Sequence, residues 1–375
     1  MSFSTELVTT RQAFESLKGD WNQLVDNMVV PEVFHRWEWN FHYFHRFRST
    51  DELFIVLARG SSGTIVGIAP LCIRRKRSLG LPVRILETIV VNLGDFRNIL
   101  VDAACHRGRV VKAILDALQV NGGRWDVIDL AQLSTRDATT FHLQHAAQGF
   151  PDWTVRSRIL TPVGRRFLKL DRTGENTDQT RQIRNRLQKL QSRGFRIRIG
   201  CDDFGDHWTT FCELQKIAWP GGPFHDAVSR QFYDDLRSSE GLKVRLEYSV
   251  VEFEGRPVAM HFGFLDARKV DFFMPVIDHK FRKERVGAVL LYAMIRHYEK
   301  THTVFDFLRG LEGYKMWYTD ELDANIRLVI YRSGSFAAFL HNAVELTRQY
   351  VVELGLPKAA LRALRGALAK KTPYR

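Results

Sequence analysis

The sequence has few of the features that mark membrane-spanning, secreted or metal-dependent proteins. It contains no run of 18 or more apolar residues, so no transmembrane helix is predicted. Its first residues, MSFSTELVTTRQAF, lack the basic start and apolar core of a signal peptide. The four cysteines (Cys72, Cys105, Cys201 and Cys212) show no CxxC or Cys/His ligand spacing, and no Ser-His-Asp or Cys-His arrangement can be read. A reduced, cytoplasmic protein without disulfides or a bound metal is therefore expected.

What the chain does have is enough length and apolar content for folded domains. Its 375 residues are 45% apolar and 26% charged, and they include eight Trp and 26 Phe. Domains usually contain about 100–200 residues, so two domains are expected. The aromatic side chains provide a large area for buried cores.

Positive charge is concentrated in two segments, against a formal net charge of +13. Residues 156–198 contain 13 Lys and Arg but three Asp and Glu, and residues 356–375 contain six basic residues and no acid. Clusters of this kind bind anions such as phosphates, nucleic acid, acidic lipid or acidic sugar. Charge alone leaves a nucleic-acid binder open, although no helix-turn-helix, zinc-finger or RNA-binding signature accompanies it.

Both basic segments have helical patterns. Residues 177–193 predict a helix with a narrow apolar stripe of Ile183, Leu187 and Leu190, lying at the junction between two halves of the chain. There it could attract a nucleotide sugar, a lipid-linked sugar or an acidic polymer. The tail 356–371 could bind peripherally to the surface of an anionic membrane. The alternative is a helix that packs on the rest of the protein and exposes its basic face to solvent.

The periodicities predict an α/β chain whose halves repeat one plan of hairpin, strand, helix and strand. Corresponding parts are the hairpins at 53–75 and 244–265, the helices at 107–118 and 287–300, and the strands at 125–130 and 304–309. Within these, Val127-Ile-Asp129 matches Val304-Phe-Asp306. The repetition indicates duplication of one α/β domain.

The stretch VFDFLRGLEGYKMWYTD (304–320) is rich in groups that donate or accept protons. It reads as an internal strand containing Asp306, followed by Arg309, Glu312, Tyr314, Lys315 and Trp317. Open α/β sheets bind ligands just past the ends of such strands, so this stretch could form the rim of an active site. The alternative is a charged surface loop, with Asp306 capping a turn or pairing with Arg309, and with Tyr314 and Trp317 packed in the core.

The stretch HKFRKERVGA (279–288) is a basic loop that opens an apolar helix. Free backbone N–H groups at a helix start, with Arg282 and Arg285 nearby and the small residues Gly287 and Ala288 in the first turn, suit a pyrophosphate. The alternative is a solvated turn before a core helix. In the preceding hairpin strand, His261 is expected to be a core histidine with its hydrogen bonds satisfied, in preference to a base.

This order of elements and motifs resembles the Gcn5-related N-acetyltransferase (GNAT) fold. In that family one strand splays from its neighbour, acyl-CoA wedges between them, and its pyrophosphate sits on the loop that opens the next helix. The resemblance maps the splayed strand to 270–277 and its neighbour to 304–309. It implies acyl-CoA as co-substrate, acetyl-CoA first, and no metal. The family's loop pattern, Gln/Arg-x-x-Gly-x-Gly/Ala, is partly matched by Arg282-Lys-Glu-Arg285-Val286-Gly287-Ala288, in which Arg285 stands where the first Gly is expected.

A narrower resemblance rests on residues 306–318 together with IVGIAPLCI (65–73) and the Trp and Phe residues near Trp37. These resemble acetyltransferase-like proteins associated with bacterial cellulose and exopolysaccharide synthesis, the CelD-like group, which look like relatives of the FemAB aminoacyltransferases. The resemblance implies that Lys315 stabilises an oxyanion or a phosphate. Glu312 or Asp306 would be the base, and Tyr314 would protonate the leaving group. The residues implied on the acceptor side are Asp95, Arg97, Trp37 and Arg309, and a plain surface turn is the alternative for Asp95 and Arg97.

The sequence therefore predicts a tandem GNAT-like protein with two mixed, mostly antiparallel sheets flanked by helices. Its expected parts are an N-terminal half (1–175), a basic linker helix with a first strand (176–200), a donor-binding half (201–335) and a basic helical tail (336–375). The expected activity is transfer of an acyl group, from acyl-CoA or another activated donor, to an amine or hydroxyl of a polar, anionic envelope or polysaccharide precursor. The alternatives are an accessory protein of exopolysaccharide synthesis without activity, favoured by Arg285, and a nucleic-acid binder.

Overall fold

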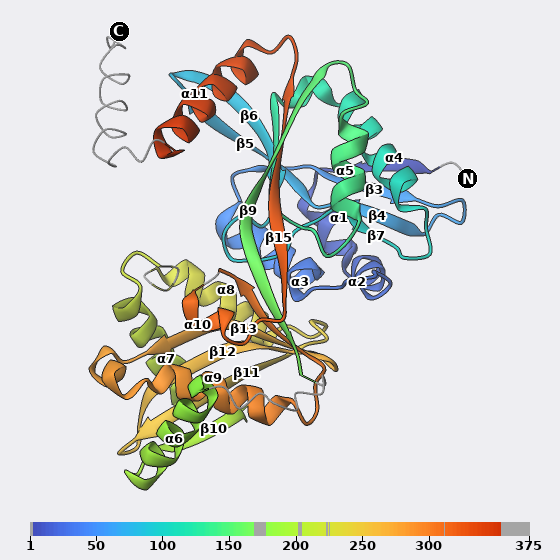
Figure 1. The fold of residues 1–375 in the computed structure, drawn as a ribbon. Coiled ribbons are helices and arrows are strands. Elements are labelled where there is room, and N and C mark those ends of the chain that lie inside the picture. The colour runs from blue at the N-terminus through green and yellow to red at the C-terminus, as the bar shows by residue number, and fades with distance from the viewer. Residues whose placement is uncertain are drawn as a thin grey trace. The chain divides into compact units, whose positions relative to one another are not determined.

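The computed structural model describes residues 3–168, 178–201, 205–222, 224, 226–310 and 312–353, which form two compact units (Figure 1). Unit 1 contains the residues up to Leu160 and those from Asn325 onward, and unit 2 is Thr161–Ala324. The sequence predicts the junction at 176–200, whereas the units divide inside strands β9 (Trp153–Phe167) and β15 (Glu321–Arg332). The interior of a continuous strand carries no change of composition, so this division leaves no signal of a linker.

Unit 1 opens with helices that place aromatic residues at helical spacing. The side chains of Phe14, Trp21 and Phe44 are buried, and Thr10 caps the first helix by accepting a hydrogen bond from the Ala13 N–H. The elements of this opening segment are β1 (Ser4–Val8), α1 (Arg11–Ser16), α2 (Lys18–Asp26), η1 (Val33–His35) and α3 (Trp37–Phe47).

Two runs of hydrogen-bonded strands follow in unit 1, in the orders β1-β3-β4-β7 and β15-β8-β6-β5-β2. A single hairpin strand is predicted at 64–75, but the chain changes from one run to the other at Pro70, which has no N–H to continue a ladder. The strands are β2 (Glu52–Leu53), β3 (Ile55–Arg59), β4 (Ile65–Ala69), β5 (Leu71–Ser78), β6 (Leu81–Thr88), β7 (Leu100–Val101) and β8 (Val127–Ser134).

The helices of unit 1 cover these strands. Val110 and Ile114 of α4 (Arg107–Val120) pack in a core with residues of β3, β4 and β8, and the 3-10 turn η2 (Gly122–Arg124) leads into β8. Helix α5 (Thr139–Ala147) packs beside α4, and α11 (Phe336–Glu353) packs on β5 and β6. None of the described helices is long and apolar enough to cross a lipid bilayer.

Unit 2 is a mixed sheet in the order β10-β11-β12-β13-β14-β9, with helices packed against it. Strands β11 and β12 form a hairpin closed by Glu254 and Gly255, both with positive φ, as a type I′ turn requires. The strands are β10 (Arg196–Cys201), β11 (Arg245–Phe253), β12 (Arg256–Leu265), β13 (Lys269–Ile277) and β14 (Val304–Arg309). The helices are α6 (Asp178–Ser192), α7 (Gly205–Ala218), α8 (Ala227–Ser238), η4 (His279–Glu284), α9 (Val286–Tyr298) and α10 (Gly313–Met316).

The predicted repeat is visible in the topology. In unit 1, β6 and β8 pair in parallel with α4 between them in the chain, and Ile85 lies opposite Val127. In unit 2, β13 and β14 pair in parallel with α9 between them, and Lys269 lies opposite Val304. The two strands matched in the sequence, β8 and β14, thus hold corresponding places. The predicted fold class, two mixed sheets flanked by helices, is confirmed.

Asp126, just before β8, connects β6 to the start of α11 and should make the stability of unit 1 depend on pH. It accepts hydrogen bonds from the Arg84 backbone N–H at 2.9 Å and from the Ser335 hydroxyl at 3.0 Å, and it pairs with the Arg84 guanidinium. Burial alone would raise the pKa of Asp126, but the hydrogen bonds from Arg84 and Ser335 outweigh it and hold the pKa below its ordinary value.

Because this carboxylate titrates lower in the folded than in the unfolded chain, its contribution is present above the ordinary Asp pKa of about 3.9 and is lost as pH falls through the folded value. We expect Asp126→Asn to be less stable at neutral pH and to lose less free energy of unfolding on acidification. Urea unfolding at several pH values measures this, with the half-exposed Asp116→Asn as control. Equal acid dependence in Asp126→Asn and the original protein would contradict it.

Candidate active site

Strands β13 and β14 pair over a short length and then separate. Lys269, Val270 and Asp271 lie opposite Val304, Phe305 and Asp306, and no pairing is recorded between the two strands beyond this point in the part of the chain that the structure describes. Strand β13 nevertheless continues to Ile277, where it still pairs with β12. Among the described strands, β14 therefore does not pair with β13 between residues 272 and 277.

His261 of β12 supports β13 where it leaves β14. Its Nε2 accepts a hydrogen bond from the Phe273 N–H at 3.1 Å, and its ring stacks on Phe272 at 4.6 Å. The accepting Nε2 places the proton on Nδ1, which lies 3.2 Å from Glu247 Oε1. Both side chains are fully buried. His261 is thus in the core as the sequence predicts, and its Nε2 fixes the backbone of the separating strand, but among the described residues its Nδ1 has no hydrogen-bond partner.

The segment that follows β13 keeps the backbone that a glycine would give it. Arg285 lies at φ 55° and ψ 35°, in the left-handed region that favours glycine. Its side chain is exposed and makes no capping hydrogen bond at the start of α9. Arg285 therefore replaces the glycine of the family pattern without changing the path expected of the loop.

The first turn of α9 combines a buried anchor with small residues. Val286 is fully buried, while Gly287 and Ala288 are partly exposed. A Cβ atom on Gly287 would lie 3.0 Å from the Ile277 side chain, so the close approach of α9 to the end of β13 favours glycine here. Arg282 of η4 is exposed one turn earlier. The N-terminus of this 13-residue helix and two arginines thus lie directly after the separating strand.

The end of β14 is shaped by Asp306. Its side chain is fully buried, and its Oδ1 accepts a hydrogen bond from the Leu308 N–H at 2.9 Å. Leu308 has a φ of 55° and Gly310 a φ of 100°, so the chain turns sharply here. Of the two predicted bases, Asp306 is therefore in the interior, whereas the Glu312 side chain is 51% exposed.

Lys315 lies in the short helix α10 and points back to the end of β14. Its Nζ donates to the Arg309 carbonyl at 2.8 Å and lies 2.8 Å from Glu312 Oε2. The lysine is buried even though Glu312 is exposed. The Glu312 carboxylate also lies against Gly310, where a Cβ atom would come within 2.9 Å of it. The structure thus brings together three predicted residues, Lys315, Glu312 and the backbone of Arg309.

The aromatic residues of this segment differ in burial. Tyr314 is partly buried and packs against the core cluster of unit 2, as Ile277 and Ala288 do. Burial, and then the Glu312 carboxylate, raise the pKa of the Tyr314 hydroxyl, so it stays protonated at neutral pH. Trp317, for which core packing is one expectation, is about half exposed. Tyr318 is buried, and burial raises its pKa to about 12.

The three acceptor-side candidates of unit 1 have internal contacts. Trp37 donates from Nε1 to the Phe14 carbonyl at 2.9 Å and stacks on Phe41 at 4.1 Å. Arg97 donates to the carbonyls of its own loop, and the Asp95 carbonyl accepts from Asn325 Nδ2 at 2.7 Å. All three are buried. Their role toward an acceptor stays a prediction, and these contacts explain their burial without one.

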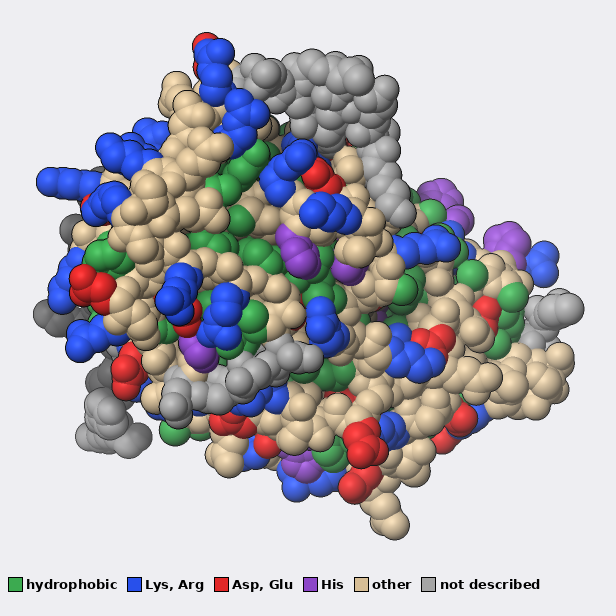
Figure 2. Space-filling view, turned by 90° about the horizontal axis from the view of Figure 1, so that it is seen from below, with side chains coloured by type: hydrophobic (Ala, Val, Ile, Leu, Met, Phe, Trp, Pro, Cys, Tyr) green, Lys and Arg blue, Asp and Glu red, His purple; other side chains and the backbone are tan. Residues whose placement is uncertain are grey.

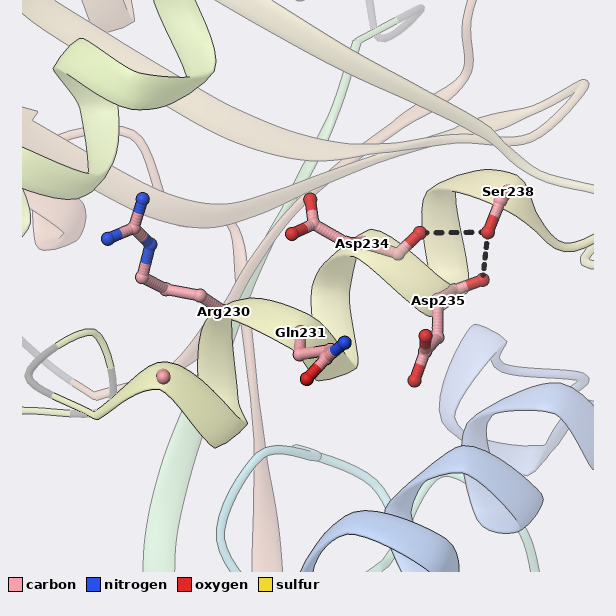
Figure 3. A pocket seen from close by; sticks show the side chains of 6 residues that line it. Arg230, Gln231, Asp234, Asp235 and Ser238 are labelled. Carbon is pink, nitrogen blue, oxygen red and sulfur yellow. Dashed lines mark hydrogen bonds between the residues drawn. The ribbon is translucent and has the colours of Figure 1, made fainter.

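Unit 2 has two further charged surfaces, one beside α8 and one on α6. A hollow of about 370 Å³ follows α8, lined by Arg230, Asp234 and Ser238 among others, and it contains none of the predicted site residues (Figure 3). The Ser238 hydroxyl is used within the helix, where it donates to the Asp234 and Asp235 carbonyls. Helix α6 forms as predicted, with Ile183 and Leu190 buried.

Figure 2 shows one face on which Lys and Arg side chains are spread among acidic and apolar ones, without forming a single stripe. Among the described residues, no group of three or more His, Cys, Asp or Glu side chains is arranged to hold a metal ion. The basic tail predicted at 356–371 lies outside the described residues.

Comparison with known proteins agrees with this arrangement. The family model described as an acetyltransferase (GNAT) domain matches residues 177–316, from the start of α6 to the end of α10. This segment is therefore similar in sequence to GNAT domains. It contains the separating strands, the start of α9 and Lys315, whereas Asp95, Arg97 and Trp37 lie outside it. No curated protein matches the sequence.

Solved structures extend the likeness over nearly the whole chain. FemX has a TM-score of 0.57 at 12% identity, covering 88% of this chain and 97% of its own. L-PGS from Bacillus licheniformis has a TM-score of 0.52 at 13% identity, covering 90% and 97%. The C-terminal domain of a protein assigned as a lysylphosphatidylglycerol synthetase from Agrobacterium fabrum has a TM-score of 0.53 at 10% identity, also covering 90% and 97%. At these identities the likeness shows the fold alone.

Proposed function

We propose that this protein transfers an acyl group from acyl-CoA, with acetyl-CoA as the first candidate, to an amine or hydroxyl of a polar, anionic envelope or polysaccharide precursor. The separation of β13 from β14 beyond Asp271 and Asp306, inside the segment similar to GNAT domains, is the observation that carries the proposal. An acyl-pantetheine arm is an extended chain with amide groups, so it suits the place where two neighbouring strands separate. The pyrophosphate would lie at the start of α9, near Arg282 and Arg285.

The residues around Lys315 match the needs of acyl transfer. The acceptor N–H or O–H attacks the thioester carbonyl, the C–S bond breaks, and the acceptor's proton passes to the exposed Glu312 carboxylate. The departing thiolate takes the proton of Tyr314, whose raised pKa keeps the phenol protonated beforehand. The Lys315 ammonium has three N–H donors, and its contacts with Arg309 and Glu312 leave one for the developing oxyanion.

An anionic acceptor is supported by charge and by one structural neighbour. Arg309 and the basic face of α6 are in the same unit as Lys315. The Agrobacterium fabrum neighbour is assigned to synthesis of lysylphosphatidylglycerol, whose acceptor would be an anionic lipid. We place the reaction in the cytoplasm, with the basic tail 356–371 as a peripheral contact to the inner face of the membrane. We also propose that this protein is a member of the CelD-like group.

The accessory alternative rests on Arg285 in the donor loop, and the conformation of Arg285 weighs against it. The loop keeps the left-handed backbone that glycine provides elsewhere in the family, at the cost of placing an arginine in a strained region. A protein that had lost activity would have no reason to keep this strained conformation. In an active protein, the arginine adds a positive charge next to the start of α9, where the pyrophosphate would lie.

Binding of the donor tests the proposal. Isothermal titration with acetyl-CoA and longer acyl-CoAs, at low and moderate salt, should show saturable binding that Arg282→Ala weakens about tenfold, since a charge-assisted hydrogen bond contributes about 1.5–3 kcal/mol. Arg296→Ala, an exposed arginine at the other end of α9, is the matched control and should bind as the original does. No binding to any acyl-CoA would refute the CoA assignment and would favour an aminoacyl-type donor or an accessory role.

A further inference from the structure

The β5–β6 hairpin of unit 1 extends beyond the strands on either side of it (Figure 1). The two strands pair with each other from Leu71 and Thr88 to Ser78 and Leu81. Strand β2 covers β5 at Cys72 and Ile73, and β8 covers β6 at residues 85–87. Residues 74–84, here called the ribbon, therefore pair with one another alone among the described strands. A two-stranded ribbon is marginal in water without further support.

The tip of the ribbon is apolar although it is exposed. Leu79 and Leu81 are 45% and 40% exposed. Leu79 and Gly80 have φ values of 48° and 88°, so they form a type I′ turn, whose first position favours Asn, Asp or Gly. A leucine there is both strained and in contact with water. An asparagine would remove both costs, so the fold itself gains nothing from this leucine.

A group of basic side chains lies directly behind the tip. Arg74, Arg75, Lys76 and Arg77 are consecutive, and residues 74–84 contain no acid. Arg74 and Arg75 make long ion pairs of 3.8 Å with Glu87 and Glu52. Basic residues on a strand edge also prevent edge-to-edge association, which accounts for the charge but leaves the exposed leucines unexplained.

Helix α11 adds exposed aromatic rings to the same part of unit 1. Its Ala337 and Ala338 pack on the cluster that contains Val83 and Ile85 of β6. Phe336 and Phe339, on another face of α11, are 67% and 66% exposed. Burial lowers the pKa of His341 in α11, and the nearby Lys76 of the ribbon lowers it further. Apolar tips and basic side chains thus belong to one packed substructure.

We propose that the ribbon, with Phe336 and Phe339, docks unit 1 on the surface of an anionic lipid bilayer. The leucines and phenylalanines would enter the interfacial region, while Arg74, Arg75, Lys76 and Arg77 lie among the phosphates. Charge complementarity selects this occupant, because Arg74 and Arg75 have only long ion pairs within the chain, and a wholly apolar partner would offer no counter-charge to the four basic side chains. The inference rests on neither the acyl-transfer chemistry nor the basic tail.

Co-sedimentation with vesicles tests it. The full chain should bind vesicles of equimolar phosphatidylcholine and phosphatidylglycerol, and bind pure phosphatidylcholine far less. Leu79→Asn should lower the partition coefficient about tenfold while leaving the thermal midpoint unchanged or higher, because Asn-Gly suits the turn. Arg77→Gln should lower it about fivefold, which corresponds to about 1 kcal/mol per basic side chain. Val120→Asn, an exposed apolar position on α4 of the same unit, is the matched control and should bind as the original does.

Equal affinity of Leu79→Asn and Val120→Asn for anionic vesicles would overturn the proposal. So would an original chain that binds neither vesicle. The other possible occupant of this surface is a second copy of the chain, which sedimentation equilibrium detects. If the original protein self-associates, and Leu79→Asn abolishes that association without changing vesicle binding, the surface is a dimer interface and not a membrane site.

Discussion

Lys315→Met should lower the turnover of acyl transfer at least about a hundredfold and leave the dissociation constant for acyl-CoA within about threefold. The ammonium group is buried and is held by the Arg309 carbonyl and Glu312, so it can act on a charge that develops nearby without reorganising. Methionine keeps the length and the packing of the side chain but removes its three donors. Glu312 stays in contact with water in this variant, so no unpaired charge is buried.

The measurement for Lys315→Met is release of the CoA thiol in the presence of cell-envelope extracts fractionated by charge, followed by titration of donor binding. Lys300→Met replaces an exposed lysine just after α9 and should keep full turnover. Lys315→Arg should recover part of the rate if a charged donor is what matters. Unchanged turnover in Lys315→Met, or a loss that is entirely a loss of donor binding, would contradict the catalytic role and leave Lys315 as a phosphate ligand or a packing residue.

His261→Leu should lower the free energy of unfolding by about 1–3 kcal/mol, as expected when buried polar groups lose a partner. The leucine would leave the fully buried Glu247 without the His261 ring beside it and would leave the Phe273 N–H without its acceptor. Because Phe273 lies where β13 leaves β14, donor binding should weaken as well. Urea unfolding followed by circular dichroism measures the first effect, and titration with acyl-CoA measures the second.

A double variant distinguishes this cause from simple loss of packing. Glu247→Leu combined with His261→Leu removes both members of the pair, so much of the lost stability should return. The Phe273 N–H would still lack its acceptor, so donor binding should stay weak. If the double variant is as unstable as His261→Leu alone, then the lost stability comes from packing and not from the polar contact between Glu247 and His261.

The elements of this fold were largely predictable because they depend on local periodicity. Strand β14, helix α9 and the β11–β12 hairpin lie where alternation and helical spacing predict them, and the parallel pairs after α4 and α9 follow from the repeated order. The candidate site was predictable in part. The stretch from Asp306 to Lys315 could be recognised as a candidate site from its proton-donating and proton-accepting residues. Its internal geometry could not be predicted, because the contact of Lys315 with the Arg309 carbonyl depends on the turn that Leu308 and Gly310 make.

Other features depend on register, which no single stretch encodes. Glu247 and His261 meet because β11 and β12 pair with the offset that their turn imposes, and an acid in one strand does not reveal its partner in the next. The left-handed conformation of Arg285 was also hidden: an arginine in the sequence reads as a departure from the glycine pattern, although its backbone has the conformation that favours glycine. Trp37 drew attention by its motif, and its contacts with Phe14 and Phe41 show a packing role that the motif did not convey.

The division of unit 1 between two distant stretches of chain has a consequence for how this protein is made. On the ribosome, residues 161–324 emerge as a continuous length that contains every strand and helix of unit 2, so that unit can form without waiting. Unit 1 must wait for β15, because β8 takes up its pairing with residues about 200 positions later, and Asn325 bonds to the carbonyl of Asp95 across 230 positions. During that interval the unpaired edge of β8 is exposed to other chains, so nascent unit 1 is where chaperones would be needed most.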